Sequence, residues 1–143
     1  MDVDRIKPAT RRKRGVVGVI MRSEKFLIIR RSLTVTAPGR LCLPGGGIEE
    51  GETESEALVR EMQEELAMDV TPVHRCWRSV TSWGTNLAWW RAEIAHDVQP
   101  VANPAEVAEI FWLSADEIRR EKDMLASLPA FVDALDRGDV SLS

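Results

Sequence analysis

Hydrophobic and polar residues follow different periods along this chain of 143 residues. Short apolar runs at 15–21 and 25–30 are separated by a polar tripeptide, which predicts two strands joined by a tight turn. The runs at 73–80 and 87–94 are rich in Val, Ile and Trp. They enclose the turn-forming stretch 83–86, which predicts a second hairpin.

Shorter apolar runs predict two more strands, a brief one at 41–43 and a longer one at 109–113. The stretch 32–40 contains Thr, Pro and Gly and has no helical period, so we expect a loop there. A loop is also expected at 95–105. Pro44 and the glycines that follow it are expected in the loop before the first helix.

Helices are predicted from their start and stop signals. Thr53-Glu-Ser-Glu56 has the capping-box pattern, so Thr53 is expected to cap a helix at 54–66. Ser114-Ala-Asp-Glu117 has the same pattern and predicts a short helix. A last helix is expected from about Pro129 to Asp136, with Gly138 as its stop signal. Strands and helices together predict a mixed fold.

Length and a hydrophobic content of 44% favour one domain with one core. No apolar run approaches the roughly 20 residues that span a bilayer, and the N-terminus lacks the apolar stretch of a secretory signal. We therefore expect a cytoplasmic protein with no membrane contact. Cys42 and Cys76 form no C-x-x-C pair, so the sequence supports neither a disulfide framework nor a cysteine zinc site.

Charge adds one feature at the N-terminus. The net charge of −4 argues against a general nucleic-acid binder, although residues 11–14 form the basic run Arg-Arg-Lys-Arg. Such a run is most often a solvated arm. The chain is therefore expected to consist of a basic, flexible arm at 1–14 and a single domain at 15–143.

The predicted helix at 54–66 carries an acidic face. At about 100° per residue, Glu61, Glu64 and Glu65 fall within roughly 100° of arc. Beside them runs an apolar stripe that can anchor the helix to the sheet, formed by Leu58, Met62 and Leu66. Like charges at these spacings repel by a few tenths of a kcal/mol per pair, so a compensating charge is expected.

Oxygen-rich clusters of this type suit hard divalent cations, and Mg²⁺ is usually held by a few carboxylates together with water and substrate phosphates. The nearby glycines would let a backbone carbonyl or N–H approach an ion or a phosphate closely. Both features favour pyrophosphate chemistry. Taken alone, however, the carboxylates are equally typical of a Glu-rich solvated helix.

The segment from Gly46 to Met68 resembles the Nudix box, whose pattern is G-x5-E-x7-R-E-U-x-E-E-x-G-U, where U is an aliphatic residue. The matching positions are Gly46, Glu52, Arg60, Glu61, Met62, Glu64, Glu65 and Met68. Ala67 stands where the pattern has Gly, which would cost on the order of 1 kcal/mol if this position needs a positive φ. The order of predicted elements is also similar to the Nudix fold, an α/β/α sandwich around a mixed sheet.

The resemblance implies roles for individual residues. Glu61 and Glu65 match the principal metal ligands of the family, and Glu64 matches an additional ligand or base. The carbonyl of Gly45, just before the box, matches a further oxygen ligand. Two supporting residues remain, Arg60 and Glu52. Arg60 can offset the acidic face, and Glu52 is better placed to orient a partner than to bind metal.

The implied reaction is hydrolysis of a nucleoside diphosphate linked to another group, with Mg²⁺ or Mn²⁺ as cofactor. Family members differ in their general base, which is either a box Glu such as Glu64 or a Glu from a later loop. Glu106 and Glu109 are the later candidates. We favour Glu106, since it lies in the predicted loop, whereas Glu109 begins a strand and can face solvent.

The sequence limits the range of substrates only through motifs that are absent from it. Extra motifs typical of dinucleotide, ADP-ribose and NADH subfamilies are missing, which leaves a nucleoside triphosphate, including a modified one, or a small nucleotide sugar. Core packing is the default role for each of the five Trp. The better candidates for contacting a base are Trp83, near the hairpin tip, and one of Trp89 and Trp90, which point to opposite faces of a strand.

Two alternatives to an enzyme stay open. One is a noncatalytic Nudix-like module that binds nucleotide or RNA, and the complete set Glu61, Glu64 and Glu65 argues against it. The other is a nucleotide-sensing regulator whose basic arm contacts nucleic acid, and the absence of a second DNA-binding domain argues against that. Dimerisation is common in the family, but nothing in the sequence identifies an interface.

Overall fold

Strand β1 lies at the centre of the sheet and determines the positions of its neighbours. The structure, a computed structural model, describes residues 13–143. β1 (Arg14–Arg22) pairs in parallel with β6 (Asn86–Glu93), and its first residues also pair antiparallel with β4 (Gly45–Gly47). The sheet is therefore mixed, as the sequence predicts.

The other strands confirm the two predicted hairpins. β5 (Thr71–Val80) pairs antiparallel with β6. β2 (Lys25–Arg31) forms the first hairpin with the end of β1, and it also pairs with β3 (Leu41–Cys42) and β7 (Val107–Leu113). The chain between β3 and β4 thus passes from the β2 part of the sheet to the β1 part.

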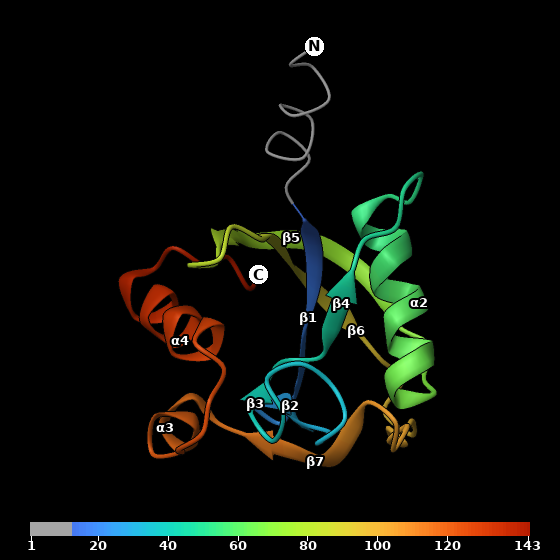
Figure 1. Cartoon of the computed structure of the whole chain (residues 1–143). Coiled ribbons are helices and arrows are strands. Elements are labelled where there is room, and N and C mark those ends of the chain that lie inside the picture. The colour runs from blue at the N-terminus through green and yellow to red at the C-terminus, as the bar shows by residue number, and fades with distance from the viewer. Residues whose placement is uncertain (1–12) are drawn as a thin grey trace.

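Helices cover both faces of this sheet (Figure 1). α2 (Glu54–Leu66) lies on one side, while α3 (Ala115–Arg119) and α4 (Ser127–Arg137) lie on the other. Among the described residues no helix is long and apolar enough to cross a membrane. The layered arrangement of helix, sheet and helix is the predicted α/β/α sandwich.

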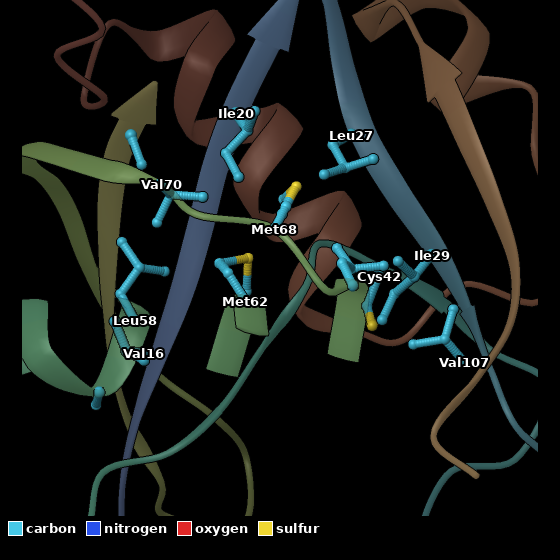
Figure 2. Close-up of a cluster of buried hydrophobic side chains, with 13 residues drawn as sticks. Val16, Ile20, Leu27, Ile29, Cys42, Leu58, Met62, Met68, Val70 and Val107 are labelled. Atoms are coloured by element: carbon cyan, nitrogen blue, oxygen red, sulfur yellow. The ribbon is translucent and has the colours of Figure 1, made fainter. Parts of the chain in front are cut away.

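Each face of the sheet has its own hydrophobic core. The core under α2 is shown in Figure 2, where Leu58 and Met62 of the helix pack against Val16 and Ile20 of β1. The opposite core is aromatic. Phe131 of α4 stacks on Trp89 of β6 with a distance of 4.9 Å between the ring centroids. Other buried residues of this core include Val19, Ile28, Leu128 and Val132.

The N-terminus of α2 is tied to the sheet by a carboxylate. Glu54 accepts hydrogen bonds from Nε1 of Trp90 and from Nη2 of Arg78, both at 2.8 Å, and Nη1 of Arg75 lies at 3.4 Å. Burial opposes the charged form, but these donors outweigh it and hold the pKa of Glu54 below its ordinary value. Helix and hairpin are thereby linked by charge-assisted bonds.

Two of the three predicted helix starts are confirmed. The Thr53 hydroxyl accepts from the Glu56 N–H at 3.1 Å, and the Glu56 carboxylate accepts from the Thr53 N–H at 2.8 Å. Ser114 and Glu117 form the same reciprocal pair at the start of α3. Both capping boxes read from the sequence are therefore present.

Several boundaries differ from the sequence prediction, and three of the differences bring buried or closely packed residues into an element. The glycines expected in a loop form β4, because without Cβ atoms their backbone can approach β1; a Cβ on Gly45 would lie 2.1 Å from the Val16 carbonyl oxygen. α4 begins at Ser127 rather than Pro129, which places the buried Leu128 on the helix. β7 begins at Val107 rather than Glu109, since Val107 pairs with Arg31 and is buried.

The predicted basic arm falls largely on residues 1–12, which lie outside the described residues. Arg14 already belongs to β1. The division of the chain into an arm and one domain therefore stays a prediction.

Ala67 ends α2 in the left-handed conformation, with φ 50° and ψ 41°. This is the position at which the box pattern has Gly, so we expect Ala67→Gly to raise the free energy of unfolding by about 1 kcal/mol. Ala130, exposed within α4, is the matched control, because Ala130→Gly should lower stability by about 1 kcal/mol. Urea denaturation of both variants tests this, and a loss of stability in Ala67→Gly would contradict it.

Candidate active site

The acidic face of α2 is divided between two buried carboxylates and an exposed one. Glu61 and Glu65 each have a relative exposure of 7%. They lie one turn apart and point toward the sheet, because the neighbouring Leu58 and Met62 anchor that side of the helix in the core. The Glu64 side chain is 49% exposed. The sequence predicts the shared face, and the structure adds that only two of its members are buried.

Arg60 supplies the compensating charge expected from the sequence. Its guanidinium forms a bidentate pair with Glu52 at 2.7 and 2.9 Å. It also donates to Glu61 at 2.9 Å, to Glu64 at 3.2 Å and to the Gly47 carbonyl at 2.8 Å. These contacts use all five guanidinium N–H groups. Arg60 therefore joins the loop before α2 to the acidic face.

Glu52 is occupied by this network. Besides the pair with Arg60, its carboxylate accepts a hydrogen bond from the Glu49 N–H at 2.8 Å. The Arg60 guanidinium is the main reason that the pKa of Glu52 falls to about 2. The geometry fits the expectation that Glu52 orients Arg60 and does not itself bind metal, a role that stays a prediction.

The glycine strand β4 lies directly against the buried carboxylates. The Gly45 N–H donates to Oε1 of Glu65 at 3.2 Å. A Cβ on Gly46 would lie 2.3 Å from the Glu61 carboxylate, whereas a Cβ on Gly47 would meet nothing within 4 Å. Gly46 is therefore a position where only glycine leaves room for Glu61.

Burial makes both carboxylates unusually basic. The pKa of Glu65 is raised to about 8, first by burial and then by the negative charges of Glu61 and Glu106. The pKa of Glu61 is also raised, again mainly by burial, although Arg60 opposes the shift. Such groups favour a bound proton or a bound cation over an unpaired charge.

Of the two later candidates for a general base, Glu106 lies at the site and Glu109 does not. The charge of Glu106 acts on both Glu61 and Glu65. Glu109 lies on β7 and pairs with Arg30 at 2.7 Å. The preference for Glu106 is thus consistent with its position.

The donor set fits a hard divalent cation, although it is not assembled as a finished ligand sphere. Within residues 13–143, no three His, Cys, Asp or Glu side chains are arranged to hold a metal ion as they stand. The reason is that Arg60 holds oxygens of Glu61 and Glu64, while Glu65 bonds to Gly45. Carboxylate oxygens and the backbone carbonyl oxygens of β4 beside them are nevertheless ligands of the type that Mg²⁺ and Mn²⁺ prefer.

A cavity of about 300 Å³ is lined in part by the glycines of β4, and Glu61 and Glu65 are not among its lining residues. Its lining includes the glycines of β4, together with Arg31, Cys42, Trp83, Leu87 and Trp89. Arg31 also lowers the pKa of Glu65, so it lies within electrostatic reach of the acidic face. The cavity therefore offers apolar surface at one end and a cation near the carboxylates.

The three candidate Trp residues take different positions. Trp83 is 60% exposed and lines the cavity. Trp89 contributes to the wall but is a core residue, since it is 1% exposed, stacks on Phe131 and donates its indole N–H to Ser79. Trp90 points to the other face of the sheet, toward α2, and is not part of the lining. Trp83 is thus the ring best placed to contact a ligand.

Sequence reasoning missed two residues at this site. Arg31 is one of two adjacent arginines in β2, and nothing in the strand pattern distinguishes them. Asn103 joins the loop at 95–105 to the end of α2 through hydrogen bonds to the Glu64 and Glu65 carbonyls. The Asn103-Pro104 dipeptide is a turn signal that could have drawn attention to it.

Comparison with known proteins places the chain in a family. The family model described as NUDIX domain matches residues 11–135. The chain therefore belongs to the Nudix hydrolase family, which confirms the resemblance read from the box. Nudix hydrolases act on nucleotide substrates and generally use divalent metal ions.

Two curated relatives illustrate the similarity. The 8-oxo-dGTP diphosphatase of Escherichia coli K12 is 42% identical over 112 residues, covering 71% of this chain and 83% of the relative. A Nudix hydrolase of Deinococcus radiodurans is 31% identical over 130 residues, covering 72% of this chain and 75% of the relative.

Solved structures confirm the fold. The MutT protein of Methanosarcina mazei has a TM-score of 0.76 at 21% identity and covers 89% of this chain and 94% of its own. A Nitrosomonas europaea Nudix hydrolase has a TM-score of 0.71 at 20% identity, with coverage of 89% and 73%. The α/β/α arrangement around a mixed sheet is therefore the Nudix fold.

The close contact between β4 and Glu61 gives a test of the site. We expect Gly46→Ala to displace the Glu61 carboxylate and to reduce turnover by on the order of 100-fold, because misplacement by about 1 Å can have that effect. Gly47→Ala, whose Cβ meets nothing, should keep turnover near that of the wild type. Steady-state assays of the two variants check this, and equal activity in both would contradict it.

The raised pKa of Glu65 predicts a pH-dependent stability of the metal-free protein. Between the ordinary value of 4.5 and about 8, the folded state binds more protons at Glu65 than the unfolded state does. The contribution of this group to stability is therefore full below pH 4.5 and is lost as the pH rises through 8, by at most about 1.4 kcal/mol per pH unit.

Glu65→Gln should consequently be more stable than the wild type at pH 8 in EDTA, and the difference should shrink toward pH 5. Glu64→Gln, at an exposed position of the same helix, is the control, because it leaves the buried Glu65 in place. Denaturation curves across this pH range measure both. A constant difference between Glu65→Gln and the wild type would show that Glu65 has no raised pKa.

Proposed function

We propose that this protein hydrolyses a pyrophosphate bond in a nucleoside diphosphate linked to another group, with a nucleoside triphosphate, including an oxidised one, as the leading candidate. One observation carries the proposal. The glycine strand contacts the buried, basic carboxylates Glu61 and Glu65, and the same strand lines a cavity that has the exposed Trp83 in its wall. A ligand with a base at one end and phosphates at the other matches this layout.

Glu61 and Glu65 are the proposed principal metal ligands, with Glu64 and the carbonyl of Gly45 as further oxygens. A bound Mg²⁺ or Mn²⁺ would neutralise phosphate oxygens and lower the pKa of an attacking water. Glu64 could leave Arg60 and serve as a metal ligand, because its hydrogen bond to Arg60 is long, at 3.2 Å, and its side chain is exposed. Arg60 would then keep the remaining carboxylates in place through its pair with Glu52.

Glu106 is the proposed general base, since it is the loop carboxylate that reaches the acidic face. It would accept the proton of the attacking water as that water approaches phosphorus in line with the leaving group. Arg31 lines the cavity and acts electrostatically on Glu65, and it would bind a phosphate oxygen. The chain thus provides both a proton acceptor and a cation within electrostatic reach of Glu65.

The cavity supports a nucleobase as the group at the other end. Trp83 is an exposed aromatic ring available for stacking, and Leu87 and Trp89 belong to the apolar lining. The E. coli relative is named for 8-oxo-dGTP, so an oxidised purine nucleotide belongs in the first assay. The noncatalytic alternatives predict binding without turnover.

The decisive experiment is a panel of dNTPs, oxidised dNTPs, nucleotide sugars and dinucleotides, assayed with Mg²⁺ and with Mn²⁺. At least one compound should be hydrolysed. Glu65→Gln should reduce turnover at least about 100-fold, because a lost ligand weakens charge stabilisation worth several kcal/mol. Glu106→Gln should reduce turnover by about 10²–10⁴ if it is the base.

Glu109→Gln is the matched control for Glu106→Gln and should stay within a few-fold of the wild type. Turnover of no compound by the wild type would refute the hydrolase proposal. Full activity of Glu106→Gln at saturating metal would instead refute only the assignment of the base and return it to Glu64.

A further inference from the structure

The last turn of α2 is capped by the loop that leads to Glu106. A helix leaves its final carbonyls without partners inside the helix. Here the Leu66 carbonyl accepts from the Val101 N–H at 2.8 Å, and the Glu65 carbonyl accepts from the Asn103 N–H at 2.9 Å. The Glu64 carbonyl accepts from Nδ2 of Asn103 at 3.1 Å. Three successive helix carbonyls are thus satisfied by this one loop, two of them by Asn103.

The Asn103 carboxamide also contacts the carboxylate at the end of the loop. Its Nδ2 lies 3.4 Å from Oε2 of Glu106, and its Oδ1 accepts from the Ala105 N–H at 3.1 Å. The acceptors face the amide nitrogen and the N–H faces the amide oxygen, which defines the orientation of the side chain. Asn103 therefore bonds at the same time to α2 and to Glu106.

The backbone around Asn103 continues this link into the sheet. The Asn103 carbonyl accepts from the N–H groups of Glu106 and Val107, at 2.9 and 2.8 Å. The Glu106 carbonyl in turn accepts from the Ser32 N–H at 3.0 Å. The Glu106 backbone is held on one side by Ser32, the residue after β2, and on the other by Asn103, so the distance between Glu106 and α2 depends on Asn103.

We propose that Asn103 is a positioning residue for hydrolysis, which fixes the Glu106 carboxylate relative to the helix that carries Glu61 and Glu65. The inference rests on the proposed function, in which Glu106 accepts the proton. Asn103 touches neither substrate nor metal in this role. It acts by joining two carboxylate-bearing segments that are far apart in the sequence, so that they keep one geometry during turnover.

Two substitutions separate the functions of the side chain. Asn103→Ala removes the hydrogen bonds of the carboxamide and keeps the backbone N–H that donates to the Glu65 carbonyl. Asn103→Asp has nearly the same shape and can still accept from Ala105, but it cannot donate to the Glu64 carbonyl or to Glu106, and it adds a negative charge there. Gln99→Ala is the control, since Gln99 is an exposed carboxamide in the same loop.

With the nucleotide that the wild type hydrolyses fastest, Asn103→Ala should lower kcat by about 10- to 100-fold, the usual effect of losing a supporting partner. Its KM and its affinity for Mn²⁺, measured by electron paramagnetic resonance, should stay within about threefold because the ligands remain. Asn103→Asp should be at least as slow as Asn103→Ala. Gln99→Ala should match the wild type. A kcat of Asn103→Ala within threefold of the wild type would overturn the inference, as would a matching loss of Mn²⁺ affinity.

A double-mutant cycle tests whether Asn103 acts through Glu106. If it does, Asn103→Ala combined with Glu106→Gln should be no slower than Glu106→Gln alone. If the two substitutions instead reduce turnover independently, so that their effects multiply, Asn103 does not act through Glu106. Normal turnover in Glu106→Gln would remove the base assignment and this inference together, while leaving the hydrolase function intact.

Amide hydrogen exchange provides a readout that needs no turnover. Asn103→Ala should speed exchange at Ala105, Glu106 and Val107 by at least about tenfold, and it should leave the first turns of α2 unchanged. Unchanged exchange at these three amides would overturn the inference even if the wild type hydrolyses nothing in the panel. Failure of the hydrolase proposal and failure of the positioning role are thus distinguished.

Discussion

The burial of two carboxylates between a helix and a strand is the constraint on which the rest of the site depends. Glu61 and Glu65 lose most of their hydration at 7% exposure, which is unfavourable for charged groups unless other charges or dipoles replace the water. Arg60 and the Gly45 N–H partly do so. These two donors do not replace all of the lost hydration, and this is why the pair of carboxylates is suited to a divalent cation.

Much of this arrangement could be predicted from the sequence because it is local. The capping box at Thr53 and the four-residue spacing of Glu61 and Glu65, about one helical turn, identify the helix and its acidic face without any tertiary information. The resemblance to the Nudix box also predicts the α/β/α fold. The left-handed conformation of Ala67 also follows from its place in that pattern.

Other features depend on contacts between distant segments, which the sequence does not reveal. Gly45 and Gly46 look like loop residues until β1 and Glu61 are seen packed against them. The strand pattern places Trp89 and Trp90 on opposite faces but does not say which face holds the cavity. Asn103 resembles an ordinary turn residue in the sequence, and only the structure shows its contacts with α2.

The parallel pairing of β1 with β6 has a consequence for how the protein folds. It joins residues about half the chain apart, such as Gly15 and Leu87, whereas the pairing of β1 with β4 closes a much shorter segment. Loop-closure entropy slows long-range pairings more than short ones. The topology therefore favours early assembly of the glycine strand against β1, with the wall that bears Trp89 added later in the folding reaction.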